Sequence, residues 1–226
     1  MNENLSTALI IFARYPEAGR VKTRLAAETG DAFAAELYRL CAEHTFEQCR
    51  KAASSGIKSI LFYSDHAERD LIEKWAGSNF IYYVQSGDDL GRRMTDAFKK
   101  VFELGAKKVL IIGTDLPDIS AELIVTAAEE LNNFDAVIGP AADGGYYLLG
   151  LKNNAPELFE KINWSTGTVF KETELKLRKL NLKYKTLKVM NDIDTKKDLI
   201  SWTESTHSDA AGTLKMKVKI LMNGNI

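Results

Sequence analysis

The sequence predicts an α/β domain with a mainly parallel, doubly wound sheet. Short apolar runs of strand length alternate along the chain with longer segments of helical period, as in repeated strand–helix–strand units. Several runs are continuously apolar, which is typical of strands covered on both faces. The chain has 226 residues, the length of one such domain. A chain of this length buries roughly 70–75% of its unfolded surface and needs no disulfide or metal to fold.

The first half of the chain predicts three strands and three helices. Residues 9–13 form a continuous apolar run, and residues 59–63 and 80–84 are the next two strands. A long helix is expected over 31–54, because its apolar residues recur with a 3.6-residue period. These residues are Phe33, Leu37, Leu40, Cys41 and His44. A short helix follows through Leu71, Ile72 and Trp75, and a helix over 91–104 has Met94, Ala97, Phe98, Val101 and Phe102 on its apolar side.

The second half continues the alternation. Residues 108–112 are the most apolar strand candidate, and Ser120 stands where the N-cap of the next helix should be. Further strands are predicted at 135–139, 146–151 and 184–188, and further helices at 169–180 and 195–202.

The end of the chain differs from the predicted domain, which covers residues 1–203. Residues 205–212 are small and polar, as in a linker. Residues 214–220 alternate between apolar residues and lysine, so they predict a strand with one lysine face. This segment is either an edge strand of the main sheet or a tail that pairs elsewhere or stays loose, and it could exchange between protomers of a homodimer. Residues 204–226 are therefore expected to be a linker and a C-terminal strand or tail.

The net charge, the cysteines and the lengths of the apolar runs indicate which kinds of partner and which cellular compartment to expect. The net charge is −1, which argues against a general nucleic-acid binder but leaves room for a local basic site. Cys41 and Cys49 are eight residues apart on the predicted helix, about 12 Å at 1.5 Å per residue. A disulfide needs less than about 7 Å, so both should be reduced. No apolar run reaches the length of a membrane span or signal-peptide core, so we expect a cytoplasmic protein.

The loop after the first strand is the strongest candidate for binding phosphate. In open α/β sheets, ligands bind at the carboxyl ends of the strands. Residues 14–24 hold four cations and one anion, and the turn residues Pro16 and Gly19 indicate a loop. Arg14, Lys22 and Arg24 suit a polyphosphate, and Gly19 would let the backbone approach it. The alternative is a solvated basic loop. The spacing fits neither a Walker A loop nor a dinucleotide-binding glycine motif.

Carboxylates and hydroxyls follow the strand at 108–112. Thr114, Asp115 and Asp118 come directly after it. Asp115 and Asp118 could share a hard cation such as Mg²⁺ or Mn²⁺, since such ions prefer carboxylate and phosphate oxygens. The alternatives are a turn residue for Asp115 and a helix cap for Asp118.

Three later loops carry further candidates. Asp143, Gly144 and Gly145 precede the strand at 146–151 and form either a substrate-facing loop or a simple turn. Trp164 and Ser165 could contact a substrate, or they could serve as local core and helix cap. Asp192 and Asp194 lie at a strand-to-helix junction, where Asp194 could cap the helix or either carboxylate could reach the metal. The three histidines have no zinc-site spacing, and His44 is expected to be a packed core residue.

These segments in combination resemble a known family. The resemblance rests on segments 12–16 with Gly19, 22–25, 113–117, 139–140 with 143–147, 164–166, and 192–195 with 198–199, and it spans residues 8 to about 203. The chain resembles the bacterial glycosyltransferase-like proteins of the nucleotide-diphospho-sugar transferase superfamily. The resemblance implies the glycosyltransferase A type fold, a single Rossmann-like α/β/α sandwich.

The same resemblance implies residue roles. Arg14, Lys22 and Arg24 would hold nucleotide phosphates, and Asp115 would hold Mg²⁺ or Mn²⁺. The chain has Asp115 and Asp118 three apart instead of the Asp-x-Asp of many sugar transferases, which leaves the second metal ligand open. It also lacks the Leu-Ala-Gly-Gly start of many nucleotidyltransferases of the superfamily.

Three functions follow as hypotheses. The first is metal-dependent glycosyl transfer from a nucleotide-diphospho sugar to a small-molecule acceptor, with Asp143 and Asp118 as catalytic residues. The second is nucleotidyl transfer from a nucleoside triphosphate to a phosphorylated small molecule, as in guanylyltransferases. The third is a nucleotide-binding module without turnover.

Overall fold

A seven-stranded sheet forms the centre of the protein, as seen in a computed structural model that describes residues 5–205 and 209–224. The strand order is β3-β2-β1-β4-β6-β5-β7, and β6 alone runs antiparallel to its neighbours among the described strands. The strands are β1 (Thr7–Ala13), β2 (Ile57–Tyr63), β3 (Ile81–Val84), β4 (Lys108–Ile112), β5 (Ala136–Pro140), β6 (Tyr146–Leu151) and β7 (Tyr184–Thr186). The predicted α/β fold with a mainly parallel sheet is confirmed.

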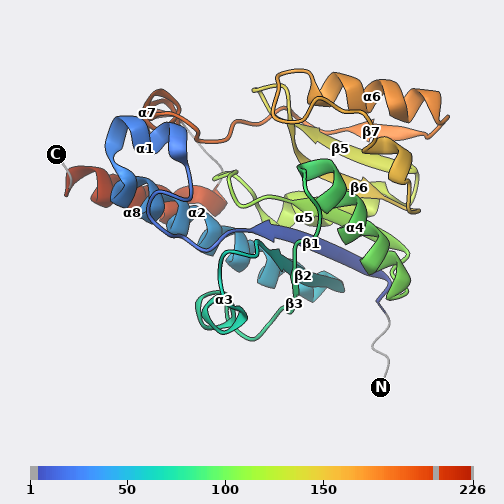
Figure 1. Ribbon diagram of the computed structural model, residues 1–226, viewed down its shortest axis with the longest axis horizontal. Coiled ribbons are helices and arrows are strands. Elements are labelled where there is room, and N and C mark those ends of the chain that lie inside the picture. The colour runs from blue at the N-terminus through green and yellow to red at the C-terminus, as the bar shows by residue number, and fades with distance from the viewer. Residues whose placement is uncertain (1–4, 206–208, 225–226) are drawn as a thin grey trace.

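Helices cover both faces of this sheet (Figure 1). They are α1 (Thr23–Thr29), α2 (Asp31–Ala52), α3 (Arg69–Ala76), α4 (Leu90–Glu103), α5 (Ala121–Glu130), α6 (Val169–Lys179), α7 (Lys196–Glu204) and α8 (Gly212–Asn223). Short 3-10 turns occur at Ala53–Ser55, Pro156–Leu158 and Asp209–Ala211. No helix in the described part of the chain is both long and apolar enough to cross a membrane.

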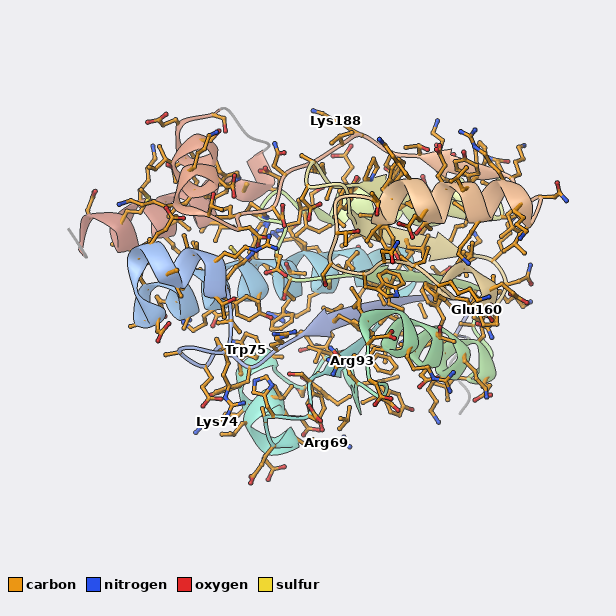
Figure 2. The ribbon with its side chains drawn as sticks, turned by 45° about the horizontal axis from the view of Figure 1, so that its top comes forward. Arg69, Lys74, Trp75, Arg93, Glu160 and Lys188 are labelled. Carbon is orange, nitrogen blue, oxygen red and sulfur yellow. The ribbon has the colours of Figure 1, made fainter. Side chains whose placement is uncertain are left out.

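Alternate residues of each central strand face different layers. Leu9 and Ile11 of β1 pack with α2, α3 and α5, whereas Ala8 and Ile10 pack with α4 and α6. Both sets are fully buried, which explains why the strand is apolar at every position. Figure 2 shows Arg69, Lys74 and Trp75 together at the α3 side of the molecule and Lys188 at the opposite side.

The strand order places a topological switch between β1 and β4. β1 pairs with β2 on one side and with β4 on the other, both in parallel. The loops that leave β1 and β4 therefore diverge, which opens a crevice at their carboxyl ends.

Local sequence signals explain where several helices begin. The Ser120 side chain accepts a hydrogen bond from the backbone N–H of Leu123, so the predicted N-cap of α5 is confirmed. Thr195 and Asp198 form a reciprocal capping box at the start of α7. Both cysteines are buried and reduced, as expected.

Two expectations are wrong. Residues 214–220 belong to the helix α8, not to a strand, and the loop after β1 gives way to the helix α1 at Thr23. In α8, Leu214 and Val218 are one helical turn apart and buried against α2, which favours the helix over the alternating pattern. Part of the predicted linker, residues 206–208, lies outside the described residues.

Candidate functional site

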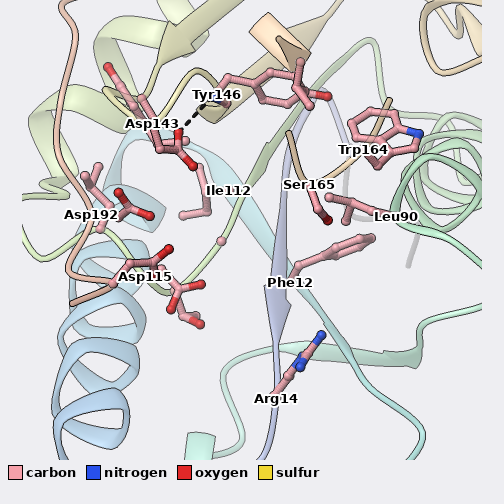
Figure 3. Close-up of a pocket in the computed structure, with 18 of the residues that line it drawn as sticks. Phe12, Arg14, Leu90, Ile112, Asp115, Asp143, Tyr146, Trp164, Ser165 and Asp192 are labelled. Carbon is pink, nitrogen blue, oxygen red and sulfur yellow. Dashed lines mark hydrogen bonds between the residues drawn. The ribbon is translucent and has the colours of Figure 1, made fainter. Parts of the chain in front are cut away.

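A cavity of about 830 Å³ opens at the carboxyl ends of β1 and β4 (Figure 3). Its volume lies within the range of about 300–1,000 Å³ that is usual for sites that bind small molecules. Loops after β1, β3, β4 and β5 line it, together with the segment before α6 and the segment before α7. The topological switch thus coincides with this cavity.

Lys22 is the buried cation of the site. Its side chain is 2% exposed, and its Nζ lies 2.8 Å from Asp115 Oδ1 and 3.3 Å from Asp194 Oδ1. Burial is the largest influence on the pKa of Lys22 and lowers it, but the two carboxylates outweigh burial and raise the pKa above its ordinary value. Lys22 is therefore charged at neutral pH and joins β4 to the segment before α7.

The backbone at Lys22 is strained. Its φ is +47°, in the left-handed region that a lysine rarely adopts. The residue immediately precedes α1, where this turn directs the side chain inward toward Asp115. Such strain is retained where the surroundings hold it in place, as these two ion pairs do.

Two further cations near the carboxyl end of β1 lie in the cavity. Arg24 Nη1 is 3.5 Å from Asp194 Oδ2, and 72% of the arginine side chain is exposed. Arg14 also lines the cavity, at the end of β1 (Figure 3). Both guanidinium groups are thus accessible to a ligand, whereas Lys22 is already held by carboxylates.

Tyr38 fixes the first loop against β4. Its hydroxyl accepts a hydrogen bond of 2.9 Å from the Arg14 backbone N–H and shares a second, of 2.8 Å, with the Thr114 hydroxyl. Burial raises the pKa of Tyr38 to about 12, so it stays protonated. These two hydrogen bonds hold the loop after β1, at Arg14, and the loop after β4, at Thr114, in fixed positions relative to each other.

One wall of the cavity is acidic. Asp115, Asp143, Asp192 and Asp194 all line it, and Figure 3 shows the first three on the same side. Burial, followed by the charge of Asp194, raises the pKa of Asp192 to about 6. This wall therefore holds more negative charge than Lys22 neutralises.

The loop around Asp143 packs closely on the segment before α6. Asp143 Oδ1 accepts a hydrogen bond of 2.8 Å from the Gly145 N–H, as in an Asx turn. Gly144 has a φ of +90° and lies directly against the Gly167 carbonyl, so no side chain fits there. Ser165 is also in the left-handed region, with a φ of +62°.

The opposite wall is largely apolar. Phe12, Leu90, Met94, Tyr146 and Trp164 line it, and Figure 3 shows Phe12, Leu90 and Trp164 facing the carboxylates across the cavity. The Trp164 indole lies against Gly91 in the first turn of α4, where a Cβ would collide with the ring. The cavity therefore offers charge on one side and flat apolar surface on the other.

The structure brings most of the predicted site residues together. The residues that line the cavity are Arg14, Lys22, Arg24, Thr114, Asp115, Asp143, Gly145, Trp164, Ser165 and Asp194. Gly19 does not line it; this glycine has a φ of +80° beside Asp31 and serves the turn. Gly144 lies behind the lining and joins two loops.

Asp118 also lies outside the lining of the cavity. Its Oδ2 accepts a hydrogen bond of 3.1 Å from the Trp202 indole, and Trp202 belongs to α7. Leu116 and Ile119, on either side of it, line the cavity, but Asp118 itself does not. The expected catalytic role of Asp118 does not fit this position: its carboxylate holds α7, the helix that follows Asp194 in the chain.

Sequence reasoning missed one whole wall segment. Gln85, Asp88, Asp89 and Arg93 line the cavity after β3 and in the first turn of α4, and Figure 2 shows Arg93 there. The rule that ligands bind at carboxyl ends of strands, applied to the strand at 80–84, would have found this segment. Tyr38 had no comparable signal, because it reaches the site from the middle of α2.

Within residues 5–205 and 209–224, no group of three His, Cys, Asp or Glu side chains has an arrangement that would itself hold a metal ion. The acidic wall therefore supplies carboxylate oxygens but not a complete set of metal ligands.

Several solved structures are similar to this chain. One is a protein from Desulfovibrio desulfuricans G20, provisionally named a nucleotide-diphospho-sugar transferase, which is 32% identical with a TM-score of 0.86. The alignment covers 97% of each chain. No curated protein matches the chain.

Two more distant structures share the fold. The inositol-1-phosphate CTP transferase from T. maritima is 14% identical with a TM-score of 0.54, and 95% of this chain and 97% of that chain align. The 4-diphosphocytidyl-2C-methyl-D-erythritol synthase from Anaerococcus prevotii DSM 20548 is 17% identical with a TM-score of 0.57, over 90% and 100% of the chains.

A family model also matches more than half of the chain. The family described as "Uncharacterized protein conserved in bacteria (DUF2064)" matches residues 45–166, which include β2 to β6. The chain therefore belongs to this bacterial family, in the nucleotide-diphospho-sugar transferase superfamily.

Proposed function

We propose that the protein is a transferase that uses a nucleotide-activated donor, and that it moves a sugar from a nucleotide-diphospho sugar to an acceptor hydroxyl. The observation that carries the proposal is the meeting of Lys22 and Arg24 with Asp115 and Asp194 at the carboxyl ends of β1 and β4. The similarity to the D. desulfuricans protein over nearly the whole chain supports the same class of donor.

The cations would bind the diphosphate of the donor. Arg14 and the largely exposed Arg24 offer several N–H donors to phosphate oxygens, and Lys22 adds a fixed positive charge between them and β4. Positive charge at this point stabilises the leaving diphosphate, on which negative charge increases in the transition state.

The acidic wall fits Mg²⁺ or Mn²⁺ as a partner of the donor. Its oxygen donors are of the type that these ions prefer, and Asp192 and Asp194 leave negative charge that Lys22 does not neutralise. Asp115 and Asp194, with Asp192 beside them, would hold the ion, and phosphate oxygens and water would complete its ligands. When bound, the ion would supply further charge neutralisation to the diphosphate.

In the proposed reaction, an acceptor hydroxyl attacks the anomeric carbon of the sugar. A new C–O bond forms, the bond from that carbon to the diphosphate oxygen breaks, and the nucleoside diphosphate leaves with the bonding electron pair. The hydroxyl proton passes to Asp143, whose carboxylate is exposed in the cavity and held by Gly145. The apolar wall of Phe12, Leu90 and Trp164 gives the sugar or acceptor a flat surface to pack on.

Product analysis tests the proposal. The purified protein is incubated with a panel of nucleotide sugars, small hydroxylated acceptors and Mg²⁺ or Mn²⁺, and released nucleotides are separated by chromatography. Glycosyl transfer releases a nucleoside diphosphate, whereas nucleotidyl transfer from a nucleoside triphosphate releases pyrophosphate. Asp115→Asn should lower turnover by at least about 100-fold, the size of effect usual for loss of such electrostatic contacts.

The matched control is Asp70→Asn, an exposed carboxylate on α3 that does not line the cavity. It should leave turnover unchanged. Release of pyrophosphate instead of nucleoside diphosphate would establish nucleotidyl transfer at the same site. If the wild type binds nucleotides but turns over no donor in the panel, and Asp115→Asn changes neither property, the enzymatic assignment is wrong.

A further inference from the structure

The helix α8 has a basic and apolar outer face. Met216 and Ile220 are one helical turn apart and are 60% and 64% exposed. Lys215 and Lys219 lie on one side of them and Lys217 on the other, by the 100° step of the helix. Lys217 and Lys219 are exposed, whereas Lys215 is half-buried and its Nζ donates a hydrogen bond to the Ser205 carbonyl. We call these five residues the α8 outer face.

The inner face of α8 packs against the rest of the protein. Leu214 and Val218 are buried in the cluster formed with α1, α2 and α7. Burial of these residues fixes the rotation of α8, so Met216 and Ile220 are held outward. Figure 1 shows α8 at the opposite end of the long axis from α6.

The charge around this face is one-sided. No acidic residue follows Asp209 in the sequence, although the whole chain has a net charge of −1. Lys217 lies within electrostatic reach of Glu47 on α2, while Lys219 is exposed at the rim of the face. The excess of lysine on α8 is therefore local and does not reflect a basic composition of the whole chain.

From this arrangement we propose that the α8 outer face binds the surface of an anionic membrane. Lysines flanking an exposed apolar centre are the pattern of helices that lie in the plane of a bilayer interface. The ammonium groups pair with anionic headgroups, and Met216 and Ile220 enter the boundary between headgroups and acyl chains. An acidic protein would match the lysines but would give no reason for exposed apolar residues at the centre.

Vesicle cosedimentation of the full chain tests this proposal. The vesicles are phosphatidylcholine alone or an equimolar mixture of phosphatidylcholine and phosphatidylglycerol. Binding is expected to the anionic vesicles and not to the neutral ones. Lys217→Gln/Lys219→Gln removes the two exposed lysines and should weaken it roughly 25-fold, at about fivefold per lysine. Met216→Gln/Ile220→Gln should weaken it on the order of tenfold.

Matched controls come from α6. Lys171→Gln/Lys179→Gln removes two exposed lysines from a helix that also carries acidic residues, and Leu175→Gln removes an apolar side chain that is 64% exposed, as Ile220 is. Both should leave vesicle binding unchanged. Thermal unfolding of each variant checks that the fold is retained, which we expect because Leu214 and Val218 are unchanged.

Two results would overturn the proposal. One is equal binding, or no binding, to the two kinds of vesicle. The other is vesicle binding that poly-glutamate abolishes and that Met216→Gln/Ile220→Gln leaves intact, because the face would then recognise an acidic partner through charge alone. Neither result bears on turnover at the cavity, which is measured with soluble substrates.

Discussion

At the scale of single residues, Lys22 connects folding to the site. Its ammonium group lies between Asp115 and Asp194, and its own side chain is 2% exposed. Lys22→Met would leave the two carboxylates without this charge. Removing one partner of a buried pair costs about 3–5 kcal/mol, but the Asp115 and Asp194 side chains are 52% and 35% exposed, so we expect about 1–3 kcal/mol.

Denaturant unfolding of Lys22→Met and of Lys51→Met measures this difference. Lys51 pairs with Glu47 on the surface, where both side chains are 56% exposed, and its loss should cost less than about 0.5 kcal/mol. Equal losses in the two variants would show that the Lys22 ion pairs do not stabilise the fold.

His44 gives a prediction about pH. Burial lowers its pKa, and its Nε2 lies 3.0 Å from the Ile119 carbonyl oxygen, with Asp118, Glu47 and Lys51 as the charged groups near it. Since the unfolded chain binds a proton near pH 6.5 and the folded protein does not, stability should fall as the pH drops from about 7 through this value. Below the lowered pKa of His44, the imidazole is protonated in both the folded and the unfolded state, so its contribution to stability no longer changes with pH.

Comparison of the wild type with His44→Gln isolates this contribution, because other titrating groups such as Asp192 are common to both proteins. The free energy of unfolding is measured in urea between pH 5 and 8. The difference between the two proteins should shrink toward acidic pH. A difference that is constant over this range would mean that His44 titrates alike in both states.

At the scale of elements, the contact between the Asp143 loop and the segment before α6 depends on Gly144. Gly144→Ala should lose stability for two reasons: its φ of +90°, and the collision of a Cβ with the Gly167 carbonyl. Gly77 has nearly the same φ, +88°, but open space around it. Gly77→Ala therefore carries only the backbone penalty, about 1–3 kcal/mol.

We expect Gly144→Ala to cost about 1–3 kcal/mol more than Gly77→Ala, because backbone atoms must move to admit the methyl group. Thermal or urea unfolding of both variants measures this. Of the two variants, only Gly144→Ala should weaken the binding of a nucleotide sugar. The loop around Gly144 lines the cavity through Asp143 and Gly145, whereas the loop around Gly77 does not line it. Equal stability losses would show that the two loops separate at no cost.

At the scale of elements, the sequence predicts some strands with their bounds but does not predict the helix α8. The strands β4 and β6 have the predicted bounds, because continuous apolar runs bounded by turn residues leave few alternatives. The alternation at 214–220 is compatible with a strand, but also with a helix that buries Leu214 and Val218. Only the apolar surface of α2, far away in the sequence, favours the helix, and no local pattern contains that information.

The site was predictable to a similar extent. Arg14, Lys22 and Asp115 follow directly from the rule that ligands bind at the carboxyl ends of strands. Asp118 obeys the same rule and lies outside the lining, because its position depends on Trp202, 84 residues later. Residues that reach the site through tertiary packing, such as Tyr38, carry no local signal.

At the scale of the whole molecule, the end of the chain completes the core. Two apolar clusters lie on the two faces of the sheet, and a third joins α1, α2, α7 and α8 beyond its carboxyl ends. This third cluster includes Ile193, which stands between Asp192 and Asp194 of the acidic wall. The packing of α8 therefore supports one side of the candidate site.

Leu214→Ala and Met216→Ala test this role of α8. Leu214 is 2% exposed and Met216 is 60% exposed, so Leu214→Ala should cost about 2–4 kcal/mol and Met216→Ala less than about 0.5 kcal/mol. In a strand the two side chains would share one face and the two losses would be similar. Urea unfolding of the full chain distinguishes these cases. Similar losses would indicate that residues 214–220 form a strand. A large loss confined to Leu214 would show that α8 packs in the cluster that contains Ile193, the residue between Asp192 and Asp194.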